Sequence, residues 1–138
     1  MITAFLALQL QGTLYNYYYV ILRNSVKGDL TSRIFENNTP KALNGESQLV
    51  VDIFYKIYYV LYIPFDKTIY YMDRNAINSK PFPKWFMTLV SIYGLGFQLF
   101  IMALMLVLKL QAFIIPFFIG YSVLILIFIF IRRVFLKT

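Results

Sequence analysis

The sequence predicts an all-α membrane protein with three parts: a C-terminal transmembrane helical hairpin, a membrane-associated N-terminal helix and an amphipathic interfacial helix between them. Hydrophobic residues make up 60% of the 138 residues and charged residues only 14%. An average soluble domain carries about 25% charged residues, so a monomeric water-soluble protein is disfavoured. Two long uncharged runs near the C-terminus and one shorter segment with helical periodicity define the parts.

The C-terminal hairpin is the strongest signal. Residues 85–108 form 24 consecutive uncharged residues, and residues 110–131 form 22 more. Crossing a hydrocarbon core of about 30 Å takes roughly 20 helical residues, so each run is long enough to span a bilayer. Only Lys109 separates the two runs. We therefore expect two antiparallel transmembrane helices joined by a tight turn.

Basic residues flank the hairpin at both ends and predict its orientation. By the positive-inside rule, both ends lie on the cytoplasmic side, or on the matrix side in a mitochondrion. A tryptophan at the start of the first span suits the headgroup boundary, and residues 132–138 form a basic tail. The predicted interface and lipid-headgroup residues are Lys80, Lys84, Trp85, Arg132, Arg133 and Lys137.

Residues 1–22 carry no charged side chain, but Gln9, Gln11 and Asn16 interrupt their apolar character. Two interpretations stay open: a third transmembrane span, or a helix held at the interface or among protein neighbours, because polar side chains within spans normally face partners. The segment lacks the basic start of a secretory signal peptide and the arginines of a mitochondrial presequence. We expect this of a protein made inside the organelle.

Residues 23–84 form the region outside the membrane, on the matrix side in the mitochondrial interpretation, and contain all six acidic residues. Loop-forming residues dominate 24–46. Apolar residues then recur at helical spacing and predict a helix over 47–63, with Ser47 as its N-cap. Pro64 is expected to stop or kink this helix. Such a helix can lie on a bilayer surface or against another subunit.

Tyrosines cover the second face of the predicted helix. Tyrosine is enriched at lipid and protein interfaces, although an A/T-rich gene would also account for 12 tyrosines and 14 phenylalanines. Small residues in the spans let helix backbones approach one another. The predicted partner-contact residues are Tyr55, Tyr58, Tyr59, Tyr62, Gly94, Gly96 and Gly120.

The composition also excludes several kinds of site. Cysteine and histidine are absent, which removes disulfides, thiolate and imidazole metal ligands, and catalysis by Ser-His-Asp or Cys-His groups. Neither predicted span holds a charged residue, which argues against a proton or ion pathway. The net charge of +7 is spread along the span flanks, which suits anionic headgroups better than nucleic acid. We therefore predict no catalytic residue, no cofactor, no metal and no nucleic-acid partner.

The aromatic runs Tyr15–Tyr19 and Phe113–Phe118 add a resemblance to these derived features. With the closing hairpin, the chain resembles the lineage-specific small membrane proteins encoded in ciliate-type mitochondrial genomes. The resemblance implies a non-catalytic accessory subunit of an inner-membrane respiratory-chain oxidoreductase complex, held by other subunits and structural phospholipid such as cardiolipin. Two alternatives are a membrane subunit of ATP synthase and a small homo-oligomeric channel or transport protein. A third is a membrane-embedded lipid enzyme using Asp66, Asp73 and Arg74.

Overall fold

The computed structural model describes residues 1–26, 38–79 and 81–136, and throughout these ranges the chain forms helices, turns and loops without a strand. The predicted all-helical fold is confirmed for this part of the chain. The helices are α1 (Ile2–Ser25), α2 (Gln48–Leu61), α3 (Ile63–Met72), the 3-10 helix η1 (Arg74–Asn78), α4 (Lys84–Val90), the 3-10 helix η2 (Ser91–Tyr93), α5 (Leu95–Val107), α6 (Gln111–Tyr121) and α7 (Val123–Phe135).

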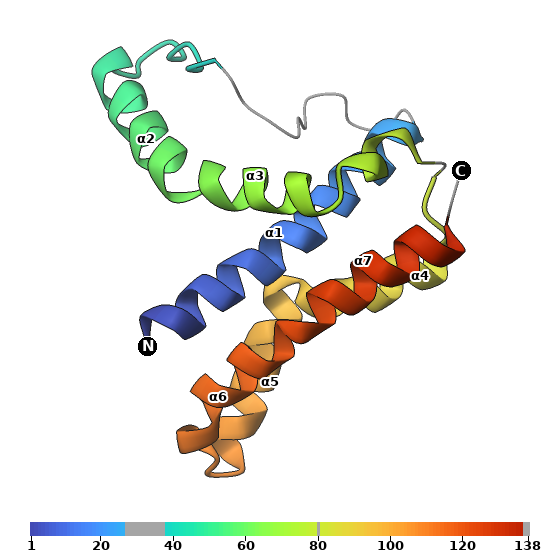
Figure 1. Ribbon diagram of the computed structural model, residues 1–138. Coiled ribbons are helices and arrows are strands. Elements are labelled where there is room, and N and C mark those ends of the chain that lie inside the picture. The colour runs from blue at the N-terminus through green and yellow to red at the C-terminus, as the bar shows by residue number, and fades with distance from the viewer. Residues whose placement is uncertain (27–37, 80, 137–138) are drawn as a thin grey trace.

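Helix α1 is the central element of the fold (Figure 1). It packs against α3 on one side and against α4, η2 and α6 on the other. The core along this helix is largely aromatic: Tyr18 lies edge-to-face with Phe82 and Phe86, with ring centroids 5.2 and 5.5 Å apart. By contrast, α2 projects away from the rest of the molecule, and none of its residues is buried.

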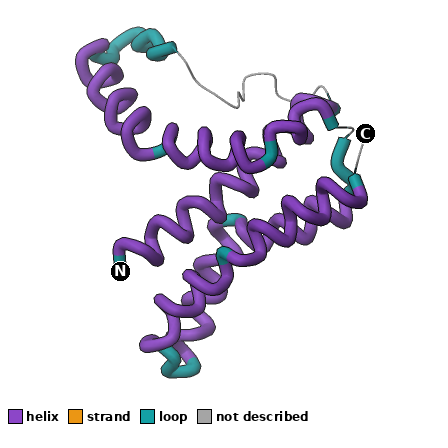
Figure 2. The backbone as a smooth tube through the Cα atoms, in the orientation of Figure 1, coloured by secondary structure: helices purple, strands orange, loops and turns teal. Residues whose placement is uncertain are grey.

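Helices α5 and α6 pack side by side and are joined by a tight turn at Lys109 (Figure 2). Lys109 has a left-handed backbone conformation with φ of 58°. The amide of Leu110 donates to the carbonyl of Met105 at 2.8 Å, and the amide of Lys109 donates to Leu106 at 3.0 Å. These two bonds form a Schellman motif, which satisfies the last carbonyls of α5 and reverses the chain. The turn therefore lies where the sequence predicts it.

The sequence predicts one straight helix over 85–108, but the structure divides this first C-terminal run into two segments. The segments Lys84–Tyr93 and Leu95–Val107 are bent by 51° relative to each other. The bend lies at Gly94, whose extended backbone (φ −62°, ψ 141°) ends one segment and begins the next. A Cβ at Gly94 would lie 2.9 Å from the carbonyl oxygen of Ser91 and 3.8 Å from the Tyr15 ring of α1. Glycine at the crossing with α1 thus permits the bend.

Two stretches among the described residues are long and apolar enough to cross a membrane: Gln48–Met72 and Gln111–Phe135. If the bent pair Lys84–Tyr93 and Leu95–Val107 counts as one span, there are three candidate spans among the described residues. Helix α1 is not one of them. This apolar character supports a membrane protein. Helix α2 ends at Leu61, close to the end predicted near Pro64, and α3 extends the apolar stretch to Met72. Pro64 lies in the first turn of α3, where a missing N–H leaves no helical bond unmade.

Candidate functional site

The most enclosed charged group in the described structure is Asp73, which follows α3 directly. Its side chain has 0% exposure and forms an ion pair with the guanidinium of Arg132, whose side chain is 5% exposed. Arg132 lies in the last turn of α7. The pair therefore joins the end of the α2–α3 arm to the end of the last helix. Burying two charges is costly unless they are paired and also hydrogen-bonded, and both conditions are met at Asp73.

Two neighbouring tyrosines of α1 complete this cluster. The phenol of Tyr18 donates to Oδ2 of Asp73 at 2.7 Å, and the phenol of Tyr17 donates to the Asp73 backbone carbonyl at 3.0 Å. Both tyrosines are buried. Three segments that are remote in the sequence thus meet at one aspartate. The Tyr15–Tyr19 run consequently includes specific hydrogen-bond donors, which composition alone does not reveal.

The residues predicted to contact lipid headgroups are partly buried within the protein and partly exposed on its surface. Arg132 was expected at a lipid headgroup, but its guanidinium is buried against Asp73, and its Nε has no hydrogen-bond partner in the described structure. Arg133 is 57% exposed and donates to the Met72 carbonyl, with Nε 3.8 Å from Asp73. Lys84 and Trp85 are exposed at the start of α4. Predictions for Lys80 and Lys137 lie outside the described residues.

A second polar cluster lies within the apolar helices and links α1, α5 and α6. The Gln11 amide nitrogen donates to the Phe118 carbonyl at 2.9 Å and to the Ser122 hydroxyl at 2.8 Å. Gln98 donates to Oε1 of Gln11 at 3.0 Å. Gln11 is 0% exposed and Gln98 is 3% exposed.

This glutamine cluster lies where both arms of the hairpin are interrupted. Gln98 is in the first turn of α5, directly after the Gly94 bend, and Ser122 separates α6 from α7. Tyr93 connects the two interruptions by donating to the Tyr121 carbonyl at 2.7 Å. A helix break within an apolar medium requires other groups to bond the freed backbone atoms. The side chains of Gln11 and Tyr93 supply two such bonds.

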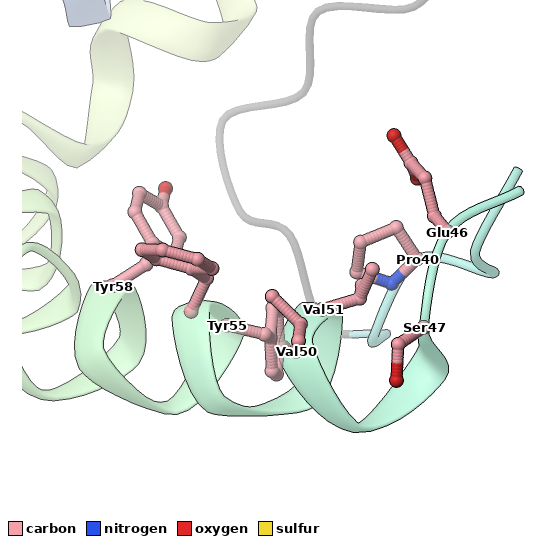
Figure 3. Close-up of a pocket in the computed structure, with 8 residues that line it drawn as sticks. Pro40, Glu46, Ser47, Val50, Val51, Tyr55 and Tyr58 are labelled. Atoms are coloured by element: carbon pink, nitrogen blue, oxygen red, sulfur yellow. The ribbon is translucent and has the colours of Figure 1, made fainter.

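The tyrosines predicted as partner contacts lie on α2 and at its C-terminal end, and they pack chiefly along the helix itself. Tyr58 and Tyr62 are stacked with centroids 5.3 Å apart, and Tyr55 lies 6.2 Å from Tyr59. Beside them, a pocket of about 580 Å³ separates α2 from the loop before it (Figure 3). Its lining residues are Pro40, Glu46, Ser47, Val50, Val51, Phe54, Tyr55 and Tyr58.

A second pocket, of about 460 Å³, lies between α1, α5 and the arm formed by α2 and α3. Its polar lining includes Asn16, Asp66 and Gln98, whereas Phe5 and Met102 lie on its apolar part. Asp66 lies within the first turn of α3 and therefore belongs to a different site from Asp73, which follows the end of that helix. Arg74 has separate contacts, since its Nε donates to the Tyr70 phenol at 3.2 Å. The structure does not bring together the three residues proposed for a lipid enzyme.

The predicted contact glycines have different surroundings. Gly94 lies at the helix bend and contacts Tyr15 of the same chain. A Cβ added at Gly96 or Gly120 would meet nothing within 4 Å, so these two glycines leave open surface on α5 and α6. Within the ranges 1–26, 38–79 and 81–136, no three acidic side chains gather in a way that could hold a metal ion.

Sequence reasoning missed both buried clusters. The sequence suggests Asp73 only as a candidate residue of a lipid enzyme, and no local pattern indicates that it pairs with Arg132 or Tyr18. Gln11 and Gln98 had a stronger signal, because each is a glutamine inside an apolar run. Polar residues in such runs normally hydrogen-bond to one another.

Comparisons with protein-family models, with curated proteins and with solved structures found no match to this chain.

Proposed function

We propose that this protein is a non-catalytic structural subunit of a large membrane complex, and specifically of a respiratory-chain complex in the mitochondrial inner membrane. In this proposal one span is α6 with α7 and the other is the bent pair α4–α5, and the basic ends of α7 and α4 lie on the matrix side. The chain joins neighbouring subunits and structural lipid, and a partner subunit covers α2. The mitochondrial part of the proposal depends on the resemblance in composition and layout.

The observation that carries the proposal is the exposed apolar surface of α2. Phe54 is 67% exposed and Val60 is 70% exposed, and both lie on a helix without a buried residue. Contiguous apolar surface of this kind marks a contact with protein or lipid. Asp52 and Lys56 lie on the same helix. Charged side chains are costly within hydrocarbon, so a protein partner suits this helix better than lipid alone.

The interior of the chain supports the same proposal. The principal polar groups of the helices are paired within the chain, as at Gln11 with Gln98 and at Asp73 with Arg132. The outward side chains of α5, α6 and α7 are mostly apolar, for example Phe100 at 60%, Phe113 at 61% and Phe130 at 62% exposure. A chain with its polar groups turned inward and its apolar groups outward needs lipid and other helices around it.

The proposal is tested by solubilising native membranes with a mild detergent and separating complexes by size. We expect the chain to migrate with a large respiratory assembly and to co-purify with its subunits. Migration as a monomer or as a ladder of small self-oligomers would contradict the proposal. The ladder would instead favour the channel alternative, and migration with ATP synthase would assign the chain to that complex.

Substitutions on α2 sharpen the test because α2 contributes nothing buried to the fold. Ile57→Glu should leave the isolated protein folded and prevent its incorporation into the complex. Lys56→Gln, one residue away and also exposed, is the matched control and should assemble normally. Normal assembly of Ile57→Glu would show that α2 does not contact a partner.

A further inference from the structure

A shallow trough of about 280 Å³ lies beside the basic end of α7. Four of its lining residues come from one face of that helix: Leu126, Ile129, Phe130 and Arg133. Their spacing of i, i+3, i+4 and i+7 places them in one row about 10 Å long. Met72 at the end of α3 lines the trough as well. The row is apolar except at its end, where the arginine lies.

The position of the Arg133 guanidinium is fixed by the chain. It donates to the carbonyl of Met72, and its Nε lies 3.8 Å from Asp73. The side chain remains 57% exposed, so donors are left for a ligand. Holding the arginine by the backbone lowers the entropy lost when a ligand binds.

The local charge at the trough is positive by one unit. Asp73 carries one negative charge, and the buried Arg132 compensates it directly. Among the described residues, Arg133 therefore contributes a positive charge that no acid fully neutralises. A planar guanidinium with several donors suits the oxygens of a phosphate. Charge and shape together favour one anionic phosphate with an apolar chain attached.

We infer that this trough binds a glycerophospholipid with a single anionic phosphate. The phosphate is bonded by Arg133, and one acyl chain lies along Leu126 and Phe130 towards the middle of the membrane. The inference goes beyond the proposed subunit role and depends only on α7 being in a bilayer. Its lipid connects the end of α3 to α7 at the place where Asp73 and Arg132 already join them.

The test is native mass spectrometry of the full-length protein in mild detergent with added phosphatidylglycerol. We expect one lipid to stay bound to the unsubstituted protein. Arg133→Gln should weaken its binding about tenfold, the effect of losing one charge-assisted interaction. Leu126→Trp should weaken binding similarly by filling the trough while all charges are kept. Lys67→Gln removes an exposed basic side chain of α3 that does not line the trough, and it is the matched control.

Four results would overturn the inference. Equal losses for Arg133→Gln and Lys67→Gln would indicate general attraction to charge. Unchanged binding by Leu126→Trp would show that no acyl chain occupies the trough. Displacement of the lipid by inorganic phosphate at similar affinity, or equal retention of diacylglycerol, would show that phosphate or chain alone suffices.

Melting curves followed by circular dichroism of the helices verify that each variant is folded. If Arg133→Gln does not fold, Leu126→Trp decides the outcome, since position 126 is 60% exposed. Lipid retention is measured on the isolated chain. A loss of lipid retention would therefore contradict this inference alone, whereas failure of the chain to migrate with a large complex would contradict the proposed function.

Discussion

Asp73 and Arg132, separated by 59 positions in the chain, form a buried ion pair that joins the end of α3 to the last turn of α7. Tyr18 of α1 donates a third contact to the same carboxylate. The pair therefore connects the helical arm α2–α3 to the hairpin through the central helix. It lies at the end of the molecule where the hairpin starts and finishes (Figure 1).

Asp73→Asn should strongly destabilise the fold. The substitution leaves the Arg132 charge buried without a counter-charge, and removing one member of a buried pair typically costs about 3–5 kcal/mol. Thermal unfolding in mild detergent, followed by the fluorescence of Trp85, measures the change. Trp85 is the single tryptophan of the chain and lies in α4, close to the cluster through its contact with Phe86.

Two variants distinguish the ion pair from the side chains themselves. The double substitution Asp73→Leu with Arg132→Met removes both charges and should recover much of the stability lost in Asp73→Asn. Asp52→Asn removes a carboxylate from the exposed helix α2 and should leave the unfolding temperature nearly unchanged. Equal effects of Asp52→Asn and Asp73→Asn would refute the structural role of the pair.

Gln11→Leu should destabilise the junction of α1, α5 and α6 by about 1 kcal/mol, because it removes the acceptor of the Gln98 amide and one of the two side-chain hydrogen bonds to the Phe118 carbonyl. Adding Gln98→Leu should cost less than the sum of the two single substitutions. A double-mutant cycle on thermal or denaturant unfolding measures this coupling. Gln9→Leu, at a partly buried position on the same helix, is the control, and additive behaviour of Gln11 and Gln98 would contradict the network.

Lys109→Gly should stabilise the turn by roughly 1 kcal/mol. The residue has a left-handed conformation with φ of 58°, which is strained for a side chain with a Cβ but not for glycine. Lys109→Gln removes the charge and keeps the Cβ, so it separates electrostatics from backbone strain. Unfolding midpoints should rise for glycine alone. An equal rise for glutamine would assign the effect to charge.

The three contact glycines should respond differently to alanine. Gly94→Ala brings a Cβ within 2.9 Å of the Ser91 carbonyl and should cost about 1–3 kcal/mol through overpacking. Gly96→Ala and Gly120→Ala meet open space and should leave the isolated chain as stable or up to about 1 kcal/mol more stable. Unfolding of the three purified variants tests this order.

The same glycine variants report on the assembled state. If neighbouring helices pack closely at Gly96 or Gly120, alanine there should lower incorporation into the complex while the isolated chain stays stable. Quantifying the assembled fraction by size separation gives this second measurement. Normal incorporation of both variants would show that these glycines do not form close helix contacts with partners.

The sequence alone predicted the all-helical class and the turn at Lys109, but not the interruptions at Gly94 and Ser122 within the two closing runs. These features follow from runs of apolar residues and from single charges between them, and such signals are local. The helix expected over 47–63 was likewise found, within a longer apolar stretch. The orientation of the hairpin across a membrane and its residence in a mitochondrion stay predictions.

Only the tertiary structure decided which polar residues form buried contacts that hold the helices together. In the sequence, Asp73 cannot be distinguished from a surface acid, because its burial depends on the packing of α1 and α7 around it. Arg132 and Arg133 are adjacent in the sequence, yet Arg132 is buried and Arg133 is exposed. The bend at Gly94 also depends on where α1 crosses the hairpin. Contacts between segments that are far apart in the chain set the environment of each charge. Such contacts cannot be predicted from the local sequence pattern.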